Sequence, residues 1–286
     1  MLTDQELKKL QNTALNIRES IIKMLVKAGS GHSAGPLGLA DVLTALYFGG
    51  VLRQSAIEPQ AENRDRFVLS CGHVCPVLYA TLAEAGYFPK EELLTLRALN
   101  SRLQGHPHFG SLPGIENTSG PLGQGLSQAI GMALAARLKK ASWRVYCLLS
   151  EGDCEEGQTW EAAMLAGREK LANLTAIVDR NHIQIDGFTE TIMPLEPLKE
   201  KFESFAWQVL EVDGHNFEQI IDAFNLAQAI HEKPTVIIAH TIPGRGVDFM
   251  ENKFEWHGKP PTEKEAETAL KELENLRTLQ GQIRVE

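Results

Sequence analysis

Four apolar runs that alternate with helical segments constrain the fold of this chain more than any other feature of its sequence. They are "RVYCLLS", "LTAIVD", "WQVLEV" and "PTVIIAHT", and a fifth run, "RFVLS", lies earlier in the chain. A strand that is apolar throughout is buried on both faces, which is typical of a parallel sheet covered by helices. Crossovers between such strands are right-handed. The sequence therefore predicts an α/β fold with a doubly wound, mostly parallel sheet and helices on both faces.

One domain accounts for the length of the chain. Its 286 residues are enough to bury a sizeable core. We expect a single domain over 1–286, in which an N-terminal helical arm covers about 1–50. Thr3 followed by Glu6 forms a capping box, which predicts that the first helix begins there. The expected helices outside the apolar runs include 3–28, about 36–48, 216–230 and a charged C-terminal helix at about 262–279.

Composition and charge exclude several classes of protein. The net charge is −9 and the pI is about 5.5, so we expect no binding of nucleic acid, which needs clustered Lys and Arg. No apolar run reaches the roughly 20 residues of a membrane span, and the N-terminus does not resemble a signal peptide. The segment Cys71-Gly-His-Val-Cys75 lacks the further ligands that zinc requires. We expect a cytoplasmic protein with reduced cysteines and no membrane partner.

Polar residues follow several of the expected strands at the point where each strand ends. The carboxyl ends of parallel strands meet at one edge of the sheet, so these residues should converge. In "LLSEGDCEEGQTWEAAMLAG", acids that crowd the end of an apolar run repel each other, which predicts that a cation binds there. The residues concerned are Gly72, His73, Glu151, Gly152, Asp153, Asn181, His182, Ile183 and the segment from Pro243 to Gly246.

A magnesium ion bound to a phosphate would satisfy this arrangement. Mg²⁺ takes one or two protein oxygens and fills its other positions with water and phosphate oxygens. Glu151 after one strand, with Asn181 and the backbone of Ile183 after the next, would supply such oxygens. Gly152 allows a backbone N–H group to approach a phosphate closely. On the residues alone, Glu151 can also be a solvated loop acid and Asn181 a turn residue.

Five motifs resemble, in the same order, the thiamine-diphosphate-binding N-terminal part of transketolases. They are "GSGHSAGPLGLADVL", "DRFVLSCGH", "GHP" with "TSGPLGQGLSQAIGMALA", "EGDCEEGQTWEAAMLAGREKLANLTAIVDRNHIQIDG" and "GRGVDFMENKFEWHG". The similarity covers nearly the whole chain, but whole transketolases are much longer. The chain is most similar to the N-terminal subunit of a split transketolase.

One position departs from the Gly-Asp-Gly motif of this family. The pair Gly152-Asp153 suggests Asp153 as the metal ligand, but that alignment requires a deletion. Placing Glu151 at the family's metal-binding Asp aligns "EEGQTWEAA" without a gap and puts Glu151 thirty residues before Asn181, the family's usual interval. Ser150 then replaces the first glycine. We therefore expect replacement of Asp153 to matter much less for cofactor binding than replacement of Glu151.

The resemblance implies a role for each matched residue. Glu151, Asn181 and the carbonyl of Ile183 are expected to coordinate Mg²⁺, for which Ca²⁺ or Mn²⁺ are possible substitutes. Four histidines are expected to surround the diphosphate and the sugar, where a pKa near neutrality suits them to move protons. The histidines are His32, His73, His106 and His257, and the residues expected to bind thiamine diphosphate are His73, Gly120, Leu122, Gly152, Asn181 and Ile185.

The resemblance also implies a second kind of subunit. In this family, the Glu that protonates the aminopyrimidine and most residues that hold the sugar phosphate belong to a pyrimidine-binding domain. We expect that domain on a separate C-terminal subunit, in an α2β2 assembly that transfers a two-carbon ketol unit from a ketose phosphate to an aldose phosphate. Glu156 matches a family Glu that lies beside a partner's catalytic Glu, although an exposed acid at a helix start also explains it.

Two other functions remain open from the sequence. The α subunit of a 2-oxo acid dehydrogenase binds the same cofactor through a similar motif, but "GPLGQG", "GHP" and His32 favour a transketolase. A scaffolding paralogue that lost its metal when Asp became Glu is the other alternative, and the retained Asn181 argues against it. The sugar is not fixed either, because split enzymes of this type act on pentose phosphates, apulose phosphate and sulfo-sugars.

Overall fold

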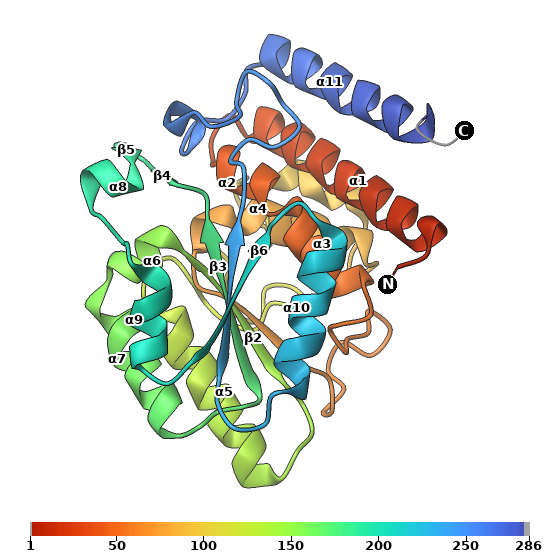
Figure 1. The fold of residues 1–286 in the computed structure, drawn as a ribbon. Helices are drawn as coiled ribbons and strands as arrows, with labels where there is room; N and C mark the ends of the chain where they lie inside the picture. Colours follow the sequence, from red (N-terminus) through yellow and green to blue (C-terminus); the bar gives the residue numbers. More distant parts are fainter. Residues whose placement is uncertain (1, 283–286) are drawn as a thin grey trace.

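The computed structural model describes residues 2–282 as a five-stranded sheet between two layers of helices (Figure 1). Neighbouring strands follow the order β1-β2-β3-β7-β6, and every pair of strands in this sheet is parallel. This arrangement confirms the predicted α/β fold class. The strands are β1 (Arg66–Leu69), β2 (Val145–Ser150), β3 (Leu174–Arg180), β6 (Gln208–Asp213) and β7 (Thr235–His240).

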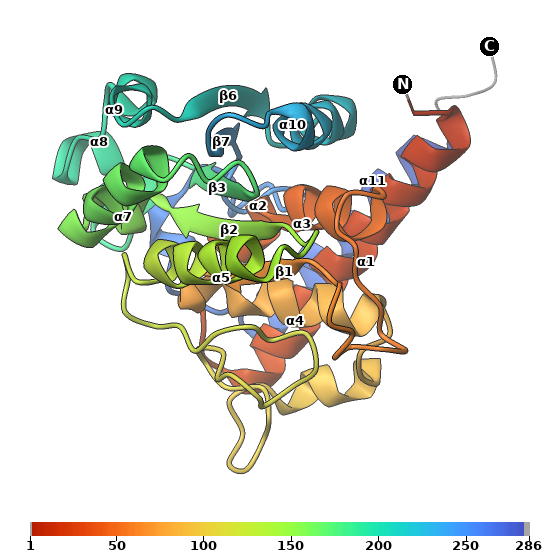
Figure 2. The ribbon, with the colours of Figure 1, turned by 90° about the horizontal axis from the view of Figure 1, so that it is seen from below.

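The helices form one layer on each face of the sheet (Figure 2). Helices α5, α7 and α9 cover one face, and α1, α3, α4 and α10 cover the other, where α11 packs along α1. The α-helices are α1 (Asp4–Ala28), α2 (Ala34–Gly38), α3 (Ala40–Phe48), α4 (Cys75–Glu84), α5 (Gly125–Lys139), α6 (Glu151–Glu155), α7 (Gly157–Arg168), α8 (Thr189–Ile192), α9 (Leu198–Ser204), α10 (Phe217–Ala229) and α11 (Glu263–Gln282). No helix among residues 2–282 is long and apolar enough to cross a membrane.

Alternating side chains of each strand pack into the two layers. In β2, Tyr146 and Leu148 belong to the core beneath α1, α3 and α4, whereas Val145, Cys147 and Leu149 belong to the core beneath α5 and α7. Successive side chains of a strand point to opposite faces, so a strand between two helical layers is apolar at nearly every position. The continuous apolar runs that predicted the sheet have this origin.

The sequence predicted the long elements better than the short ones. Helix α1 begins with the expected capping box of Thr3 and Glu6. The single helix predicted at about 36–48 is wrong, because α2 and α3 are separate helices that meet at Leu39. The acid-rich segment after β2 is not a loop but helix α6, because Ser150 and Asp153 form a capping box that the sequence analysis overlooked. A hairpin of β4 (Ile183–Gln184) and β5 (Gly187–Phe188), with α8 after it, was also not expected.

Two glycines in helices allow a comparison between a close contact with a neighbouring segment and an open position. A Cβ atom on Gly167 of α7 would lie 1.8 Å from the carbonyl oxygen of Phe205, whereas a Cβ atom on Gly131 of α5 would meet no atom within 4 Å. We expect Gly167→Ala to lower the free energy of unfolding by about 2–3 kcal/mol through overpacking. Gly131→Ala should raise it by up to about 1 kcal/mol, because alanine favours a helix more than glycine does. Denaturant unfolding of both variants checks this, and equal effects would contradict the close contact.

Candidate functional site

Most of the residues singled out from the sequence line one cavity of about 320 Å³. The cavity lies where the segments after β1, β2 and β3 leave the sheet, and the segment after β7 reaches it through His257. Among the predicted site residues, Glu156 does not line it. The lining residues are His32, Gly35, His73, His106, Gly120, Leu122, Ser150, Glu151, Gly152, Glu155, Asn181, Ile183, Gln184, Ile185, Asp186 and His257.

Three histidines from separate segments form a compact cluster in this cavity. The ring centroids of His32 and His73 lie 5.0 Å apart, those of His73 and His257 5.2 Å apart, and those of His32 and His257 5.6 Å apart. The Nδ1 atoms of His32 and His257 are buried and have no hydrogen-bond partner among the described residues. Two imidazole nitrogens in the cluster therefore have unused hydrogen-bonding capacity.

Burial keeps the histidines of the cavity neutral. It lowers the pKa of His32 to about 4 and the pKa of His257 to about 4. The pKa of His73 is lowered by burial and then by its histidine neighbours, and the pKa of His106 is lowered by burial and then by Arg97. A neutral imidazole accepts a proton at one nitrogen and donates one at the other. At neutral pH these side chains therefore carry no fixed charge, and the pKa near neutrality that we expected is wrong for His32 and His257 because both are buried.

A close backbone contact at Gly72 brings the long loop before α5 into the cavity. A Cβ atom on Gly72 would lie 2.7 Å from Ser119 Oγ, 2.9 Å from the backbone nitrogen of Gly120 and 3.0 Å from a ring carbon of His106. Any larger residue would push these groups away from the end of β1. The absence of a side chain at Gly72 thus places His106, Gly120 and Leu122 in the cavity wall.

Glu151 is held by a cation from its own chain. Its Oε1 accepts hydrogen bonds from Arg180 Nη1 at 2.5 Å and from the backbone N–H of His182 at 2.9 Å, and its Oε2 accepts one from the Thr189 hydroxyl. The side chains of Glu151 and Arg180 are almost completely buried. The crowded acids predicted a cation, for which we expected a metal alone. In the structure the cation is Arg180, the basic residue directly before Asn181.

Asn181 follows the end of β3, and Asp179 fixes its side chain. Asn181 Nδ2 donates to Asp179 Oδ2 at 2.7 Å, and Asn181 Oδ1 accepts from the backbone N–H of Ile183 at 3.1 Å. Burial raises the pKa of Asp179 to about 7, although a hydrogen bond from Thr241 opposes this shift. Because an amide oxygen has two lone pairs, Asn181 Oδ1 keeps one of them for a further ligand.

Asp153 faces the protein interior and does not line the cavity. Its carboxylate accepts hydrogen bonds from the Ser70 hydroxyl at 2.5 Å, from the Gly123 N–H at 2.7 Å and from both the N–H and hydroxyl of Ser150 at 2.7 and 3.0 Å. It thereby joins the ends of β1 and β2 to the loop before α5. This position is consistent with an aspartate that is not the metal ligand, and the Ser150-x-x-Asp153 capping box was the sequence signal of its structural role.

Two other predicted residues occupy peripheral positions. Glu156 is exposed at the start of α7, apart from the cavity, so its role at a subunit interface stays a prediction. Ile185, between β4 and β5, lines the cavity with 64% of its surface exposed. Glu155 and Gln184 also line the cavity and are joined by a hydrogen bond of 2.8 Å. Their contact depends on the unexpected hairpin, so the sequence pattern did not indicate them.

Cysteine chemistry does not contribute to the site. Cys71, Cys75, Cys147 and Cys154 are free and buried, and burial raises the pKa of each thiol. Within residues 2–282, no group of three or more His, Cys, Asp or Glu side chains could hold a metal ion. The predicted magnesium site differs in kind, because it combines one carboxylate with an amide, a carbonyl and phosphate oxygens.

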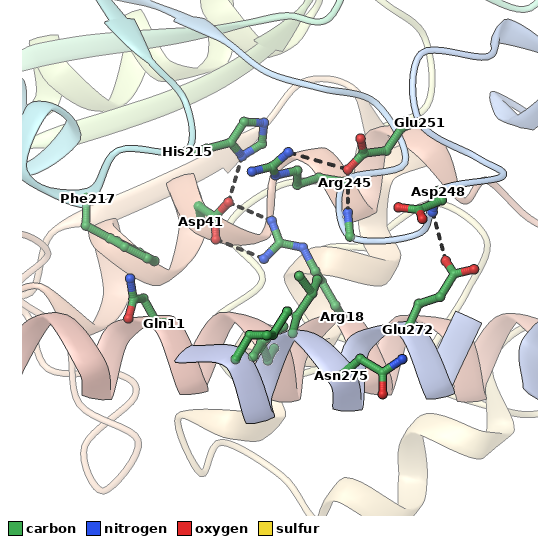
Figure 3. Close-up of a pocket in the computed structure, with 14 residues that line it drawn as sticks. Gln11, Arg18, Asp41, His215, Phe217, Arg245, Asp248, Glu251, Glu272 and Asn275 are labelled. Carbon is green, nitrogen blue, oxygen red and sulfur yellow. Dashed lines mark hydrogen bonds and ion pairs between the residues drawn. The ribbon is translucent and has the colours of Figure 1, made fainter. Parts of the chain in front are cut away.

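A second cavity, of about 500 Å³, lies beside the segment that carries His257 (Figure 3). Asp41 forms two hydrogen bonds with Arg18, at 2.9 and 2.6 Å, and a third with His215 Nδ1 at 2.7 Å. His215 Nε2 accepts the backbone N–H of Ile242 at 2.7 Å, so the imidazole proton lies on Nδ1 and is donated to Asp41. This buried network fixes the start of the segment that leads from β7 to His257.

The lowered pKa values predict how stability depends on pH. An unfolded histidine has a pKa near 6.5, so between about pH 4 and 6.5 the unfolded chain binds more protons than the folded chain does. The free energy of unfolding should therefore fall as the pH decreases through this window. His257→Gln should lose less stability between pH 7 and pH 5 than the unaltered chain, as measured by denaturant unfolding. The exposed His231 offers the control variant His231→Gln, and a parallel profile for His257→Gln would contradict the prediction.

The hydrogen bonds of Asp153 predict a large loss of stability on its removal. Asp153→Ala leaves the Ser70 hydroxyl and the Gly123 N–H buried without their partner, which should lower the free energy of unfolding by roughly 3 kcal/mol. Asp222→Ala, at an exposed position of α10, should change it by less than about 0.5 kcal/mol. Urea unfolding of the two variants makes the comparison, and similar midpoints would show that Asp153 has no such role.

The chain is similar to known proteins over almost its whole length. Residues 10–276 match the family model described as "Transketolase, thiamine diphosphate binding domain". The chain is 42% identical over 256 residues to an apulose-4-phosphate transketolase subunit of Phocaeicola vulgatus, and the match covers 90% of each chain. It is 43% identical over 265 residues to the 6-deoxy-6-sulfo-D-fructose transketolase subunit SqwG of a Clostridium species, covering 93% of this chain and 96% of that one.

Longer relatives are matched over less than half of their length. Human transketolase is 41% identical over 270 residues, which are 94% of this chain and 42% of the human protein. The crystal structure of transketolase from Campylobacter jejuni matches with a TM-score of 0.87 and 35% identity, covering 96% of this chain and 43% of that one. From the family match and these identities, we conclude that this chain belongs to the transketolase family and comprises its thiamine-diphosphate-binding domain.

Proposed function

We propose that this chain is the thiamine-diphosphate-binding subunit of a transketolase made from two kinds of subunit. As one diphosphate-binding domain, it holds the cofactor diphosphate together with a divalent cation. A separate C-terminal subunit supplies the pyrimidine-binding domain in a cytoplasmic α2β2 enzyme. The assembled enzyme transfers a two-carbon ketol unit from a ketose to an aldose. The names of the two bacterial relatives, each called a subunit, support the need for a partner.

The observation that carries this proposal is the meeting of three kinds of group in one cavity. Neutral histidines, small residues that expose their backbone and oxygen donors all line the same space of about 320 Å³. Each kind comes from different segments of the chain, so their meeting results from the fold. Together they match the needs of a diphosphate with a hard cation on one side and a sugar on the other.

The oxygen donors fit a hard divalent cation, for which we propose Mg²⁺, with Ca²⁺ or Mn²⁺ as substitutes. Glu151, Asn181 and Ile183 line the same cavity. Oε1 of Glu151 already accepts two hydrogen bonds, whereas Oε2 accepts one and keeps a lone pair for a metal. Asn181 Oδ1 likewise keeps one lone pair. Such a ligand set leaves positions for water and phosphate oxygens, as magnesium prefers.

The remaining residues position the substrates and move protons. Thiamine diphosphate, when bound, would supply a carbon nucleophile for the ketose carbonyl. Gly152, with its N–H, and Gly120 and Leu122 hold the cofactor, and Ile185 packs against its ring from the cavity rim. The neutral imidazoles of His32 and His257, with their unpaired Nδ1 atoms, take protons from the sugar hydroxyl groups and return them. In the same proposal, His73 and His106 donate hydrogen bonds to the diphosphate and the sugar.

The proposed roles of Glu156 and of the substrate both involve the partner subunit. The exposed position of Glu156, outside the cavity, suits contact with another protein chain, and we propose that it pairs there with the partner's catalytic Glu.

The two bacterial relatives are named for a phosphorylated and a sulfonated sugar. We propose a sugar of this anionic class, such as a pentose phosphate, as the substrate. Most of its binding groups would lie on the partner.

The alternatives differ in what supports them. The dehydrogenase alternative is not favoured, because the family match and the named relatives are transketolases. The scaffold alternative has one observation in its favour, because the carboxylate of Glu151 already binds Arg180. Measurement of metal and cofactor binding separates the scaffold from the enzyme.

The requirement for a partner can be tested by reconstitution. The purified chain alone should show no ketol transfer, because its match to the longer transketolases covers less than half of their length. Addition of a pyrimidine-domain subunit from the same organism should give ketol-transfer activity that saturates near equimolar amounts of the two subunits. A coupled assay of the aldose product measures this activity. Full activity from this chain alone would contradict the proposal.

The metal ligand can be tested by a substitution that keeps the size of the side chain. Glu151→Gln removes the charge that a divalent cation needs, so Mg²⁺-dependent binding of thiamine diphosphate should weaken at least about tenfold, or 1.4 kcal/mol. Glu161→Gln, on the exposed face of α7, has the same change in charge and should leave binding unaltered. Isothermal titration calorimetry of the assembled complex measures both. No binding by the unaltered complex would favour the scaffold.

A further inference from the structure

Arg180 joins three carboxylates that come from three places in the chain. Its Nη1 donates to Glu151 Oε1 at 2.5 Å, and its Nη2 donates to Oε1 of both Glu190 and Glu196 at 2.7 Å. The side chains of Arg180 and Glu151 are 1% and 2% exposed, whereas those of Glu190 and Glu196 are 39% and 55% exposed. One buried guanidinium therefore connects a carboxylate at the cavity with two carboxylates near the surface.

The two outer carboxylates anchor the segment that follows β3. Glu190 lies in α8, and its Oε1 also accepts the N–H of Leu195 at 3.2 Å. Oε2 of Glu196 accepts the N–H of Leu198 at 2.8 Å, at the start of α9. The same segment carries the hairpin whose residues line the cavity. Contacts to Arg180 thus fix the backbone between the hairpin and α9.

The charges of this cluster are matched to a divalent cation. Three carboxylates and one guanidinium carry a net charge of −2 when all are ionised. If Glu151 were the only partner of Arg180, the arginine would neutralise it and oppose a cation nearby. Glu190 and Glu196 occupy the other end of the guanidinium and offset its charge. Because Glu190 and Glu196 offset the charge of Arg180, the negative charge of Glu151 remains available to attract a metal ion.

We propose that Arg180 is a positioning residue through which Glu190 and Glu196 set the affinity of the cavity for a divalent cation. This inference rests on the proposed function, because it takes Glu151 as a metal ligand. Neither outer carboxylate lines the cavity, so both act on the metal through Arg180. Coupling of this kind is reciprocal. A metal that binds Glu151 weakens the contact of Glu151 with Arg180, which strengthens the contacts of Arg180 with Glu190 and Glu196. Metal binding should therefore order the backbone of residues 183–198.

The test uses Glu190→Gln with Glu196→Gln in one full-length chain that is assembled with the pyrimidine-domain subunit. Mn²⁺ is titrated in the presence of saturating thiamine diphosphate, and the free ion is followed by electron paramagnetic resonance. The double variant should bind Mn²⁺ roughly five- to tenfold more weakly, because partly exposed charges each contribute modestly. The matched control is Glu92→Gln with Glu169→Gln, which removes two partly exposed carboxylates that pair with Arg102 and Arg137 away from the cavity. This control has the same net charge as the double variant, and its affinity for Mn²⁺ should equal that of the unaltered complex.

A second readout examines the coupling to the backbone. In the unaltered chain, Mn²⁺ with thiamine diphosphate should slow hydrogen exchange in residues 183–198, and the double variant should lose most of this effect. A purely structural role would lower stability in the double variant without a change in Mn²⁺ affinity, and this result would overturn the inference while leaving the proposed function intact. Failure of the unaltered assembled complex to bind Mn²⁺ would overturn both.

Discussion

The buried ion pair between Glu151 and Arg180 is the interaction on which the cavity depends. Burying two charges costs several kcal/mol for each ion, and only good geometry with further hydrogen bonds offsets that cost. Both conditions hold here, because the backbone of His182 and the Thr189 hydroxyl also bind Glu151. Since Glu151 follows β2 and Arg180 ends β3, the pair fixes the relative position of the two strand ends that carry the proposed metal ligands.

Glu151 and Asp153 lie only two residues apart in α6 but have different roles, because their surroundings differ. Glu151 is paired with a cation, and its carboxylate has capacity left for a ligand. Asp153 binds only uncharged donors from Ser70, Gly123 and Ser150, and burial raises its pKa despite those hydrogen bonds. The first turn of the helix thus places one carboxylate at the cavity and turns the other towards the loop before α5.

The sheet could be predicted because its signal is local: the central strands β2 and β3 are buried at every position, and their apolar runs are visible in the strands themselves. The four histidines, Glu151 and Asn181 of the cavity followed from the resemblance and from the rule that strand ends converge, whereas Glu155 and Gln184 did not. Arg180, in contrast, could not be assigned from its neighbours, because its partners Glu190 and Glu196 lie further along the chain and contact it only in the folded structure. The hairpin β4–β5 is two residues on each side, too short for a periodic pattern to reveal.

The four histidines of the cavity reach it from four separate segments, which has a consequence for how the protein acquires its binding activity. No single element of the fold presents more than one of them, so a chain that is only partly folded has no binding surface. A ligand that contacts all four segments binds the native state alone, and by mass action it stabilises the whole domain in proportion to the logarithm of its concentration. Cofactor supply would therefore govern how long the subunit survives in the cell, as well as how fast the enzyme works.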